Sequence, residues 1–331
     1  MSNETLTAMK GIHVGHAHIP EIATGCTVIL PEGGAVAGVD IRGGAPGTVG
    51  TDGLHPLNLV DRVHGLFFTG GSAFGLSVAE GIRYFLKERN LGFETDHGVV
   101  PIVSGAVIFD LGVNTTELLP DSALGYEACE NASGNPVPDG SHGAGRGATV
   151  GKICGLERAM MGGVGSVHLR VPSGLEVGAI MVVNAFGDVV DPDQNRIIAG
   201  CRRSPESLEF SNTEFEMFER LQINGFSTLE STVVGSVITN ARLNKTQLTK
   251  VAQMAHDGLA RTVRPSHTLF DGDTIFALSH GDLDPVDPSV VGSLAAVAVA
   301  QAILKGVRHA RSHENIPGLG DLYGPLPSND F

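Results

Sequence analysis

One transition in this chain constrains its fold more than any other feature: a polar, acidic stretch runs directly into a strand of the buried kind. Residues 202–230 (RRSPESLEFSNTEFEMFERLQINGFSTLE) are poor in core-forming side chains and predict a surface connector. Residues 232–239 (TVVGSVIT) follow at once and are rich in the β-branched residues that favour strands. The chain therefore passes from its surface to its core close to Thr232.

The composition favours a compact, turn-rich protein and argues against nucleic-acid binding and against disorder. Its 22 basic and 36 acidic residues give a net charge of −14, whereas nucleic-acid-binding proteins usually present a basic face. With 42% hydrophobic and only 18% charged residues, the chain is far from a disordered composition. Tryptophan is absent, so the core must consist mainly of Val, Ile, Leu and Ala.

The sequence pattern predicts a cytoplasmic protein without a membrane span. Residues 1–10 lack the basic-then-apolar run of a signal peptide. The most apolar window, residues 290–304, is interrupted by polar residues and is shorter than a span requires. The four cysteines are widely scattered, without a CxxC pair, and predict reduced thiols. They are Cys26, Cys129, Cys154 and Cys201.

Hydrophobic periodicity predicts strands and helices along the whole chain, with no internal repeat. Residues 26–41 predict two strands joined by a Pro-Glu-Gly-Gly turn, and residues 175–191 predict a hairpin that turns at 185–188. Capping residues and amphipathic patterns also predict several helices. These are a helix with Ser72 as its N-cap, a helix over residues 244–262, and a helix opened by Asp287 and Pro288 that runs to about Lys305.

Two motifs that suggest a ligand fail a closer test. Residues 143–152 (GAGRGATVGK) look like a phosphate-binding loop, but Arg146 stands where a glycine is required and Ile153 replaces the magnesium-binding Ser or Thr. The histidines of HVGHAH have the spacing of metal ligands, yet no partner motif is visible. These histidines are His13, His16 and His18. We expect no metal and no other cofactor.

Two features carry candidate chemistry, each with an ordinary alternative. Asp271 and Asp273 flank Gly272 at the mouth of a predicted strand, either as solvated turn carboxylates or as a pair that orients a nucleophile. Thr232 suits a strand simply because it is β-branched. If the chain is cut before Thr232, however, the freed α-amine, with an unperturbed pKa of about 8, becomes a base beside its own hydroxyl.

Long segments resemble the DmpA-like peptidase family, which includes the L-aminopeptidase/D-esterase, the β-peptidyl aminopeptidases and the nylon-oligomer (6-aminohexanoate-oligomer) hydrolase. The segments are TGCTVILPEGGAVAGVDIRGGAPGT, FFTGGSAFGL, GATVGK, VGAIMVVNAFGDVVDP and RTVRPSHTLFDGDTIFALSHG. The resemblance extends from about Gly11 to Val307. It implies an α/β (α+β) fold, an αββα sandwich of the N-terminal-nucleophile type related to ornithine acetyltransferase. It also implies a single domain, residues 1–331, that cleaves itself into residues 1–231 and 232–331.

The resemblance assigns the nucleophile to Thr232, because TVVGSVITNA matches the strand that follows the family's cleavage point. Ser236 lies four residues too late. The match is closest to the nylon-oligomer hydrolase branch, whose nucleophile is Thr and whose paired acids fall on Asp271 and Asp273. We expect Asp273→Asn to lower turnover and to leave the fold largely intact, because the residue lies at a strand mouth.

Two further polar positions complete the site that the resemblance implies. Asn184 (VVNAFGD) would stabilise the oxyanion, and Lys152 (GATVGK) would polarise the site. The implied activity is hydrolysis of a small amide or short peptide through an acyl-enzyme on Thr232. Transfer of the acyl group to an amine, or a binding or assembly protein that never cleaves, are the alternatives.

Two departures from the family pattern bear on this implied chemistry. Ser231 precedes the nucleophile where the nylon hydrolase has Asn, and Phe109 replaces a Tyr of that branch's site. Ser231 therefore bears on the cleavage before Thr232, and Phe109 bears on the preferred substrate. We expect a homo-oligomer, a tetramer or larger, of two-chain units.

Overall fold

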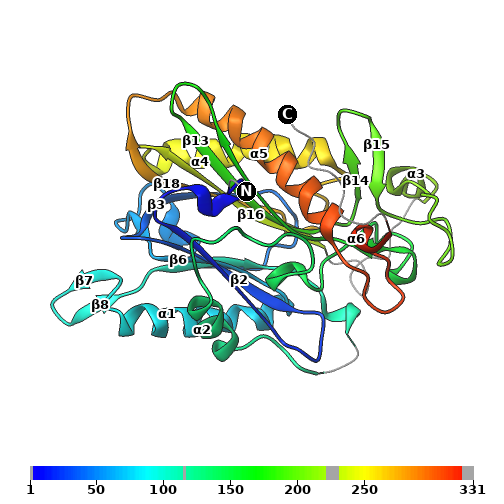
Figure 1. Cartoon of the computed structure of the whole chain (residues 1–331), viewed down its shortest axis with the longest axis horizontal. Helices are drawn as coiled ribbons and strands as arrows, with labels where there is room; N and C mark the ends of the chain where they lie inside the picture. Colours follow the sequence, from blue (N-terminus) through cyan, green and yellow to red (C-terminus); the bar gives the residue numbers. More distant parts are fainter. Residues whose placement is uncertain (1–2, 115–116, 221–230, 323–331) are drawn as a thin grey trace.

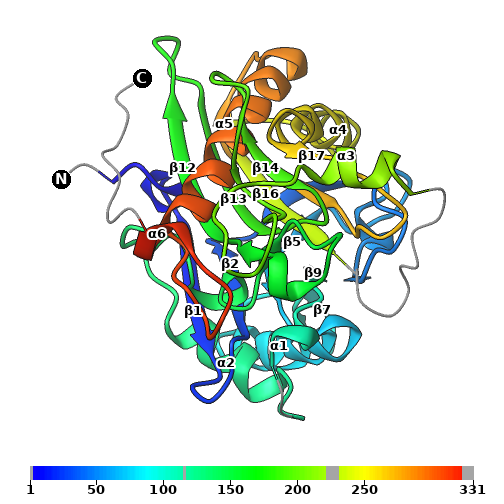
Figure 2. The ribbon, with the colours of Figure 1, turned by 90° about the vertical axis from the view of Figure 1, so that its right-hand side faces the viewer.

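Two β-sheets lie face to face, and helices cover the outer side of each (Figure 1). The structure, a computed structural model, describes residues 3–114, 117–220 and 231–322. Figure 2 shows the same layers turned by 90°, with α4 and α5 at one side of the molecule and α1 and α2 at the other. The fold is the expected α/β architecture, an αββα sandwich.

The first sheet has six strands in the order β12-β13-β16-β18-β3-β5. All its neighbours are antiparallel except β16 and β18, which are parallel. Two long helices, α4 (Lys245–Thr262) and α5 (Pro288–His309), pack on its outer face. The strands are β12 (Gly163–Arg170), β13 (Glu176–Asn184), β16 (Thr232–Ala241), β18 (Thr274–Leu283), β3 (Ala35–Ile41) and β5 (Arg62–Val63).

The second sheet has five strands in the order β1-β2-β6-β9-β4, with α1 (Val78–Glu88) and α2 (Ser122–Glu130) on its outer face. Its strands are β1 (Ile12–His18), β2 (Gly25–Pro31), β6 (Gly65–Thr69), β9 (Val103–Val107) and β4 (Thr48–Val49). Smaller sheets lie outside these layers. They are β15 (Arg196–Ala199) with β14 (Asp188–Asp191) and β17 (Val263–Arg264), β10 (Thr149–Val150) with β11 (Met160–Met161), and β7 (Phe93–Thr95) with β8 (Gly98–Val100).

The central strands are apolar on both faces because each face meets a different layer. Along β16, Val233 and Val237 pack in the cluster formed with α4 and α5, whereas Val234 and Ile238 pack in the cluster between the two sheets. This alternation follows from the two-residue period of a strand. The predicted buried strand after the connector is therefore confirmed.

The two long helices follow their sequence signals closely. Asn244 caps α4 through a capping box with Gln247, and Asp287 caps α5 by accepting a hydrogen bond from Ser289 N–H. Helix α5 is long and apolar enough to cross a membrane, but 61% of its most apolar window is buried inside the protein. Its contacts with β12, β13 and α4 account for its apolar composition as a core helix.

Three local predictions are wrong in detail. The 175–191 hairpin does not form, because both edges of β13 are occupied by β12 and β16, and β14 joins another sheet. Ser72 is not the N-cap of an α-helix, since its φ of +53° is left-handed and a 3₁₀ helix (Ser72–Ser77) precedes α1. The two strands predicted within residues 26–41 form, but they enter different sheets.

The connector is only partly a surface segment. Arg202 and Thr213 are buried, and Thr213 begins the short helix α3 (Thr213–Phe218). The buried carboxylate of Asp188 accepts hydrogen bonds from the backbone N–H groups of Cys201 and Thr213, at 2.7 and 2.6 Å. The first half of the connector is thus anchored to β14, and residues 221–230 lie outside the described part of the chain.

Candidate active site

The strand arrangement brings three distant segments to one end of the six-stranded sheet. Strand β16 begins at Thr232 and runs parallel to β18, so the acidic turn that precedes β18 lies at the same end. Strand β13 runs antiparallel to β16, so its last residue, Asn184, lies directly opposite Thr232. The parallel pair and its antiparallel neighbour therefore assemble the candidate site.

Thr232 lies at the centre of this arrangement, next to the predicted cleavage point. Its side chain is buried (the residue is 5% exposed), and its Oγ1 donates a 2.5 Å hydrogen bond to the carbonyl oxygen of Ser231. The same carbonyl oxygen accepts a second hydrogen bond, at 2.9 Å, from the backbone N–H of Gly272. The Ser231 N–H in turn donates to the Phe270 carbonyl at 2.9 Å. The peptide before Thr232 is thus held against the acidic turn.

The Asp273 carboxylate is buried and is surrounded by N–H donors. Its Oδ1 accepts from the backbone N–H of Val233 at 2.9 Å, one residue beyond Thr232. Its Oδ2 accepts from the backbone N–H of His267 at 2.9 Å and lies 2.8 Å from the imidazole Nδ1 of the same residue. Asp273 therefore ties the start of β16 to the loop before β18.

Asp271 lies on the same turn in a different environment. Its carboxylate accepts hydrogen bonds from Thr268 Oγ1 at 2.6 Å, from Thr268 N–H at 3.0 Å and from Phe186 N–H at 3.3 Å. Burial, and then the charge of Asp273, raise the pKa of the Asp271 carboxyl to about 7. This carboxyl can therefore hold or release a proton near neutral pH, as a general acid or base must. The alternative of solvated turn carboxylates is excluded, because both acids are buried.

Lys152 and Asn184 form a second polar group on the other side of Thr232. Lys152 Nζ donates to the side-chain Oδ1 of Asn184 at 2.8 Å and to its backbone carbonyl at 3.2 Å. Burial lowers the pKa of Lys152 to about 7, against the opposing effect of the Asp271 and Asp110 carboxylates. The Asn184 Nδ2 donates at 3.0 Å to the backbone carbonyl of Phe109. Phe109 thus contacts the site through its main chain.

Two polar residues of this region were missed by the sequence reasoning. Asp110 follows Phe109 and is buried, with hydrogen bonds from Gly71 N–H and Thr24 Oγ1 at 2.7 Å each. Burial raises the pKa of Asp110 to about 6. His267 binds Asp273, as described above. The available signals were an Asp directly after an apolar run (AVIFD) and a His six residues before a paired acid.

The glycine-rich loop after β3, residues 42–45, holds the acidic turn through backbone hydrogen bonds. Arg42 N–H donates to the Asp273 carbonyl at 2.9 Å, and Ala45 N–H donates to the Asp271 carbonyl at 2.8 Å. A Cβ at Gly43 would lie 2.2 Å from the Asp271 carbonyl oxygen, so only glycine allows this approach.

The histidines of HVGHAH do not converge on one point. His16 is half-buried with its Nδ1 2.9 Å from Thr27 Oγ1, whereas His13 pairs with Glu32 at 3.2 Å. Within residues 3–114, 117–220 and 231–322, no group of three or more His, Cys, Asp and Glu side chains could hold a metal ion. The cysteines are free thiols. The groups that meet at the candidate site are the Thr232 hydroxyl, a lysine, two carboxylates and a set of amide donors.

Comparisons with known proteins agree with this fold. A β-aminopeptidase of Burkholderia sp. has a TM-score of 0.70 at 20% identity, with 98% of this chain and 96% of that chain covered. The L-aminopeptidase D-Ala-esterase/amidase of Ochrobactrum anthropi, described as a variant of the Ntn hydrolase fold, has a TM-score of 0.72 at 17% identity, with 93% and 86% covered. The molecule therefore has an N-terminal-nucleophile hydrolase fold.

Sequence similarity defines the family more narrowly. The model of peptidase family S58 matches residues 4–318, and the chain belongs to this family. An uncharacterized aminopeptidase of Mycobacterium tuberculosis is 39% identical, with 96% of this chain and 98% of the relative covered. The 6-aminohexanoate-oligomer endohydrolase of Kocuria sp. is 30% identical, with 90% and 84% covered. The chain is thus a hydrolase of peptide or related amide bonds, and the family resemblance seen in its sequence is confirmed.

Proposed function

We propose that the protein is a self-processing amidohydrolase or aminopeptidase whose nucleophile is Thr232, freed as an N-terminal residue by cleavage after Ser231. The observation that carries this proposal is the Ser231 carbonyl oxygen, held between Thr232 Oγ1 at 2.5 Å and the Gly272 N–H at 2.9 Å. A hydroxyl beside the preceding carbonyl, with an amide donor on its oxygen, is the arrangement that an internal acyl shift requires.

The first proposed reaction is the cleavage of the chain. Thr232 Oγ1 attacks the Ser231 carbonyl carbon, and the Gly272 N–H stabilises the negative charge that develops on the carbonyl oxygen. The bond between this carbon and the Thr232 nitrogen breaks, the nitrogen takes the hydroxyl proton, and an ester remains. Water then hydrolyses the ester, which leaves a carboxylate on Ser231 and a free α-amine on Thr232.

The second reaction is turnover of substrate at the same hydroxyl. The freed α-amine accepts the proton of Thr232 Oγ1 as the oxygen attacks the substrate carbonyl, and it returns this proton to the leaving amine. Water hydrolyses the resulting ester. Asp273 keeps the start of β16 in place through Val233 N–H, and Asp271 and Lys152 supply groups that titrate near neutrality.

Asn184 is the side chain that we assign to the oxyanion. One hydrogen of its amide is donated to the Phe109 carbonyl, and an amide carries two, so the second can meet a substrate oxygen. Lys152, bonded to Asn184 Oδ1 at 2.8 Å, fixes which end of the amide is the oxygen. A donor of this kind contributes about 3 kcal/mol to the transition state.

The proposed substrates are short peptides or oligomers of ω-amino acids, in keeping with the names of the relatives. Acyl transfer would use the same ester on Thr232, but its acyl group would pass to an amine instead of to water. Product analysis in the presence of an added amine acceptor distinguishes the two reactions, because transfer yields a new amide at the expense of the free acid.

Intact-mass analysis of the purified protein tests the cleavage. We expect two pieces, residues 1–231 and 232–331, the second beginning Thr-Val-Val-Gly. Thr232→Ala should abolish both cleavage and amide turnover, because one hydroxyl serves both reactions. Thr232→Ser keeps the hydroxyl and should retain both.

Ser236→Ala is the matched control, since this hydroxyl lies four residues further along β16 and is buried between β13 and β18. It should leave the cleavage point unchanged. A second piece that begins at Ser236, or an active protein that stays a single chain, would contradict the proposal.

We also propose that the enzyme works in the cytoplasm as a homo-oligomer of two-chain units, a tetramer or larger. Four free thiols, three of them buried, suit a reducing compartment. Sedimentation analysis of the cleaved protein measures the mass of the assembly, and fractionation of the source cells measures its location.

A further inference from the structure

His267 makes two contacts with one oxygen of a carboxylate next to the nucleophile. Its imidazole Nδ1 lies 2.8 Å from Asp273 Oδ2, and its backbone N–H donates to the same oxygen at 2.9 Å. The other oxygen of Asp273 accepts the Val233 N–H at 2.9 Å. One short chain of hydrogen bonds therefore connects His267 to the residue after Thr232.

The backbone at His267 is shaped for this double contact. Its φ of +58° is left-handed, a conformation that non-glycine residues rarely adopt and that costs free energy unless the surroundings impose it. The imidazole packs edge-on against that of His256, with ring centroids 4.8 Å apart and planes at 73°. His256 is fully buried on α4, and its Nε2 lies 3.1 Å from the Asp40 carbonyl. The imidazole of His267 is thus packed against a fully buried side chain that is itself held by a hydrogen bond.

We propose that His267 is a positioning residue of the active site: its Nδ1–H holds the Asp273 carboxylate in the orientation that aligns Val233 and hence Thr232. The proposal rests on the proposed function of Thr232. The carboxylate is an acceptor, so the proton of the bond belongs to Nδ1. The Nε2 atom is buried without a hydrogen-bond partner in the described part of the chain, which favours the imidazole with Nε2 unprotonated.

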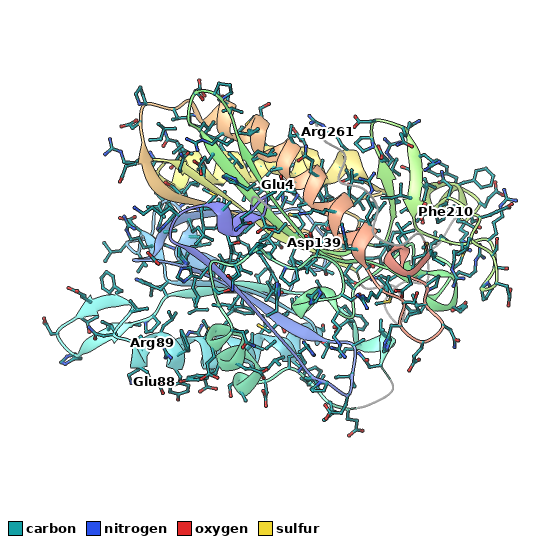
Figure 3. All side chains as sticks on the ribbon, in the orientation of Figure 1. Glu4, Glu88, Arg89, Asp139, Phe210 and Arg261 are labelled. Carbon is teal, nitrogen blue, oxygen red and sulfur yellow. The ribbon has the colours of Figure 1, made fainter. Side chains whose placement is uncertain are left out.

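Two substitutions separate the donor from the backbone shape. His267→Asn keeps a side-chain N–H near the position of Nδ1, whereas His267→Gly removes it, and both residues accept a positive φ. Asn90→Gly is the matched control, because Asn90 also has a positive φ, 55°. Asn90 follows Glu88 and Arg89 at the end of α1, on the far side of the five-stranded sheet from α5 (Figure 3).

The readouts are the rate of cleavage after Ser231 and the kcat and KM for amide turnover. His267→Gly should lower the cleavage rate and kcat by about 10- to 100-fold, the effect of losing one hydrogen bond to a charged group, with KM nearly unchanged. His267→Asn should restore both rates to within about threefold of wild type, and Asn90→Gly should match wild type.

Two results would overturn the proposal. Wild-type rates in His267→Gly would show that the Asp273 carboxylate is oriented without a hydrogen bond from the His267 side chain. Equal losses of rate in the Asn and Gly variants would show that packing of the ring on His256 matters instead. If the wild-type protein neither cleaves nor hydrolyses amides, the proposed function fails rather than the role of His267.

A spectroscopic measurement on the wild-type protein does not depend on how the variants fold. In protein labelled with ¹⁵N-histidine, the His267 signal, identified by its absence in His267→Asn, should report a protonated Nδ1 and an unprotonated Nε2. The opposite tautomer would contradict a bond donated to Asp273, whether or not the enzyme is active.

Discussion

At the scale of single residues, the candidate site depends on buried carboxylates that accept hydrogen bonds on both oxygens. Each oxygen of Asp273 faces N–H donors, those of Val233 and His267. The sequence suggested that an amide at this strand mouth would leave the fold largely intact. The structure corrects this expectation, because an Asn side chain must turn its own NH₂ group toward one of these donors.

Asp273→Asn should therefore lower stability as well as activity. We expect a loss of about 1–3 kcal/mol in the free energy of unfolding, the cost of an unsatisfied buried donor. It should be measured by denaturant titration in a Thr232→Ala background, where all chains stay intact. Turnover in the Thr232 protein should fall by about 100-fold or more.

The control for Asp273→Asn is Asp282→Asn, which alters an exposed carboxylate on β18, the strand that directly follows Asp273. Its unfolding curve and its turnover should both match those of the parent. An Asp273→Asn protein as stable and as active as the control would show that neither oxygen of Asp273 needs to be an acceptor.

At the scale of elements, the site depends on a loop that contributes no reacting group. Residues 42–45 run beside the acidic turn, and their N–H groups donate to the backbone carbonyls of Thr268, Asp271 and Asp273. A Cβ on Gly43 would meet the Asp271 carbonyl oxygen at 2.2 Å and the Asp273 nitrogen at 2.4 Å. Both neighbours are backbone atoms, which cannot rotate away.

Gly43→Ala should therefore displace the turn and slow both cleavage and amide turnover, with a loss of about 1–3 kcal/mol in stability from overpacking. Gly134→Ala is the matched control, since a Cβ at that exposed glycine meets no atom within 4 Å. If Gly43→Ala and Gly134→Ala had equal rates, the acidic turn would tolerate a displacement of residues 42–45.

At the scale of the whole molecule, the buried ionisable groups make stability depend on pH. The pKa of Asp271 rises from 3.8 to about 7 on folding, so between these values the folded chain binds more protons than the unfolded chain. Stability therefore falls as the pH rises through this window. The pKa of Lys152 falls from 10.5 to about 7, so its contribution rises again from pH 7 upward.

Removing the carboxyl should remove the first of these two trends. In the Thr232→Ala background, the melting temperature of Asp271→Asn relative to its parent should increase from pH 5 to about pH 7 and then level off toward pH 8. Ser236→Ala, a buried substitution without a titrating group, should show a constant difference. A constant difference for Asp271→Asn would mean that this carboxyl is ionised in the folded protein throughout the range.

Local sequence determined much of this protein. The β-branched run after the connector, the capping box at Asn244 and the Asp287-Pro288 cap predicted β16, α4 and α5, because each signal acts within one turn or one strand. The family motifs also indicated the architecture and the polar residues that the structure brings together. These features follow from residues close together in the chain.

Only the tertiary structure decided how the segments pair and what surrounds each charge. No local signal shows that β16 and β18 are parallel or that β13 is paired on both edges, so the predicted hairpin was wrong. The same pairing buries Asp271 and Lys152 and brings His267 onto Asp273. The partners of a strand and the burial of a charged group depend on segments far away in the chain. A local stretch of sequence therefore does not predict them, and they are set only when the whole chain has folded.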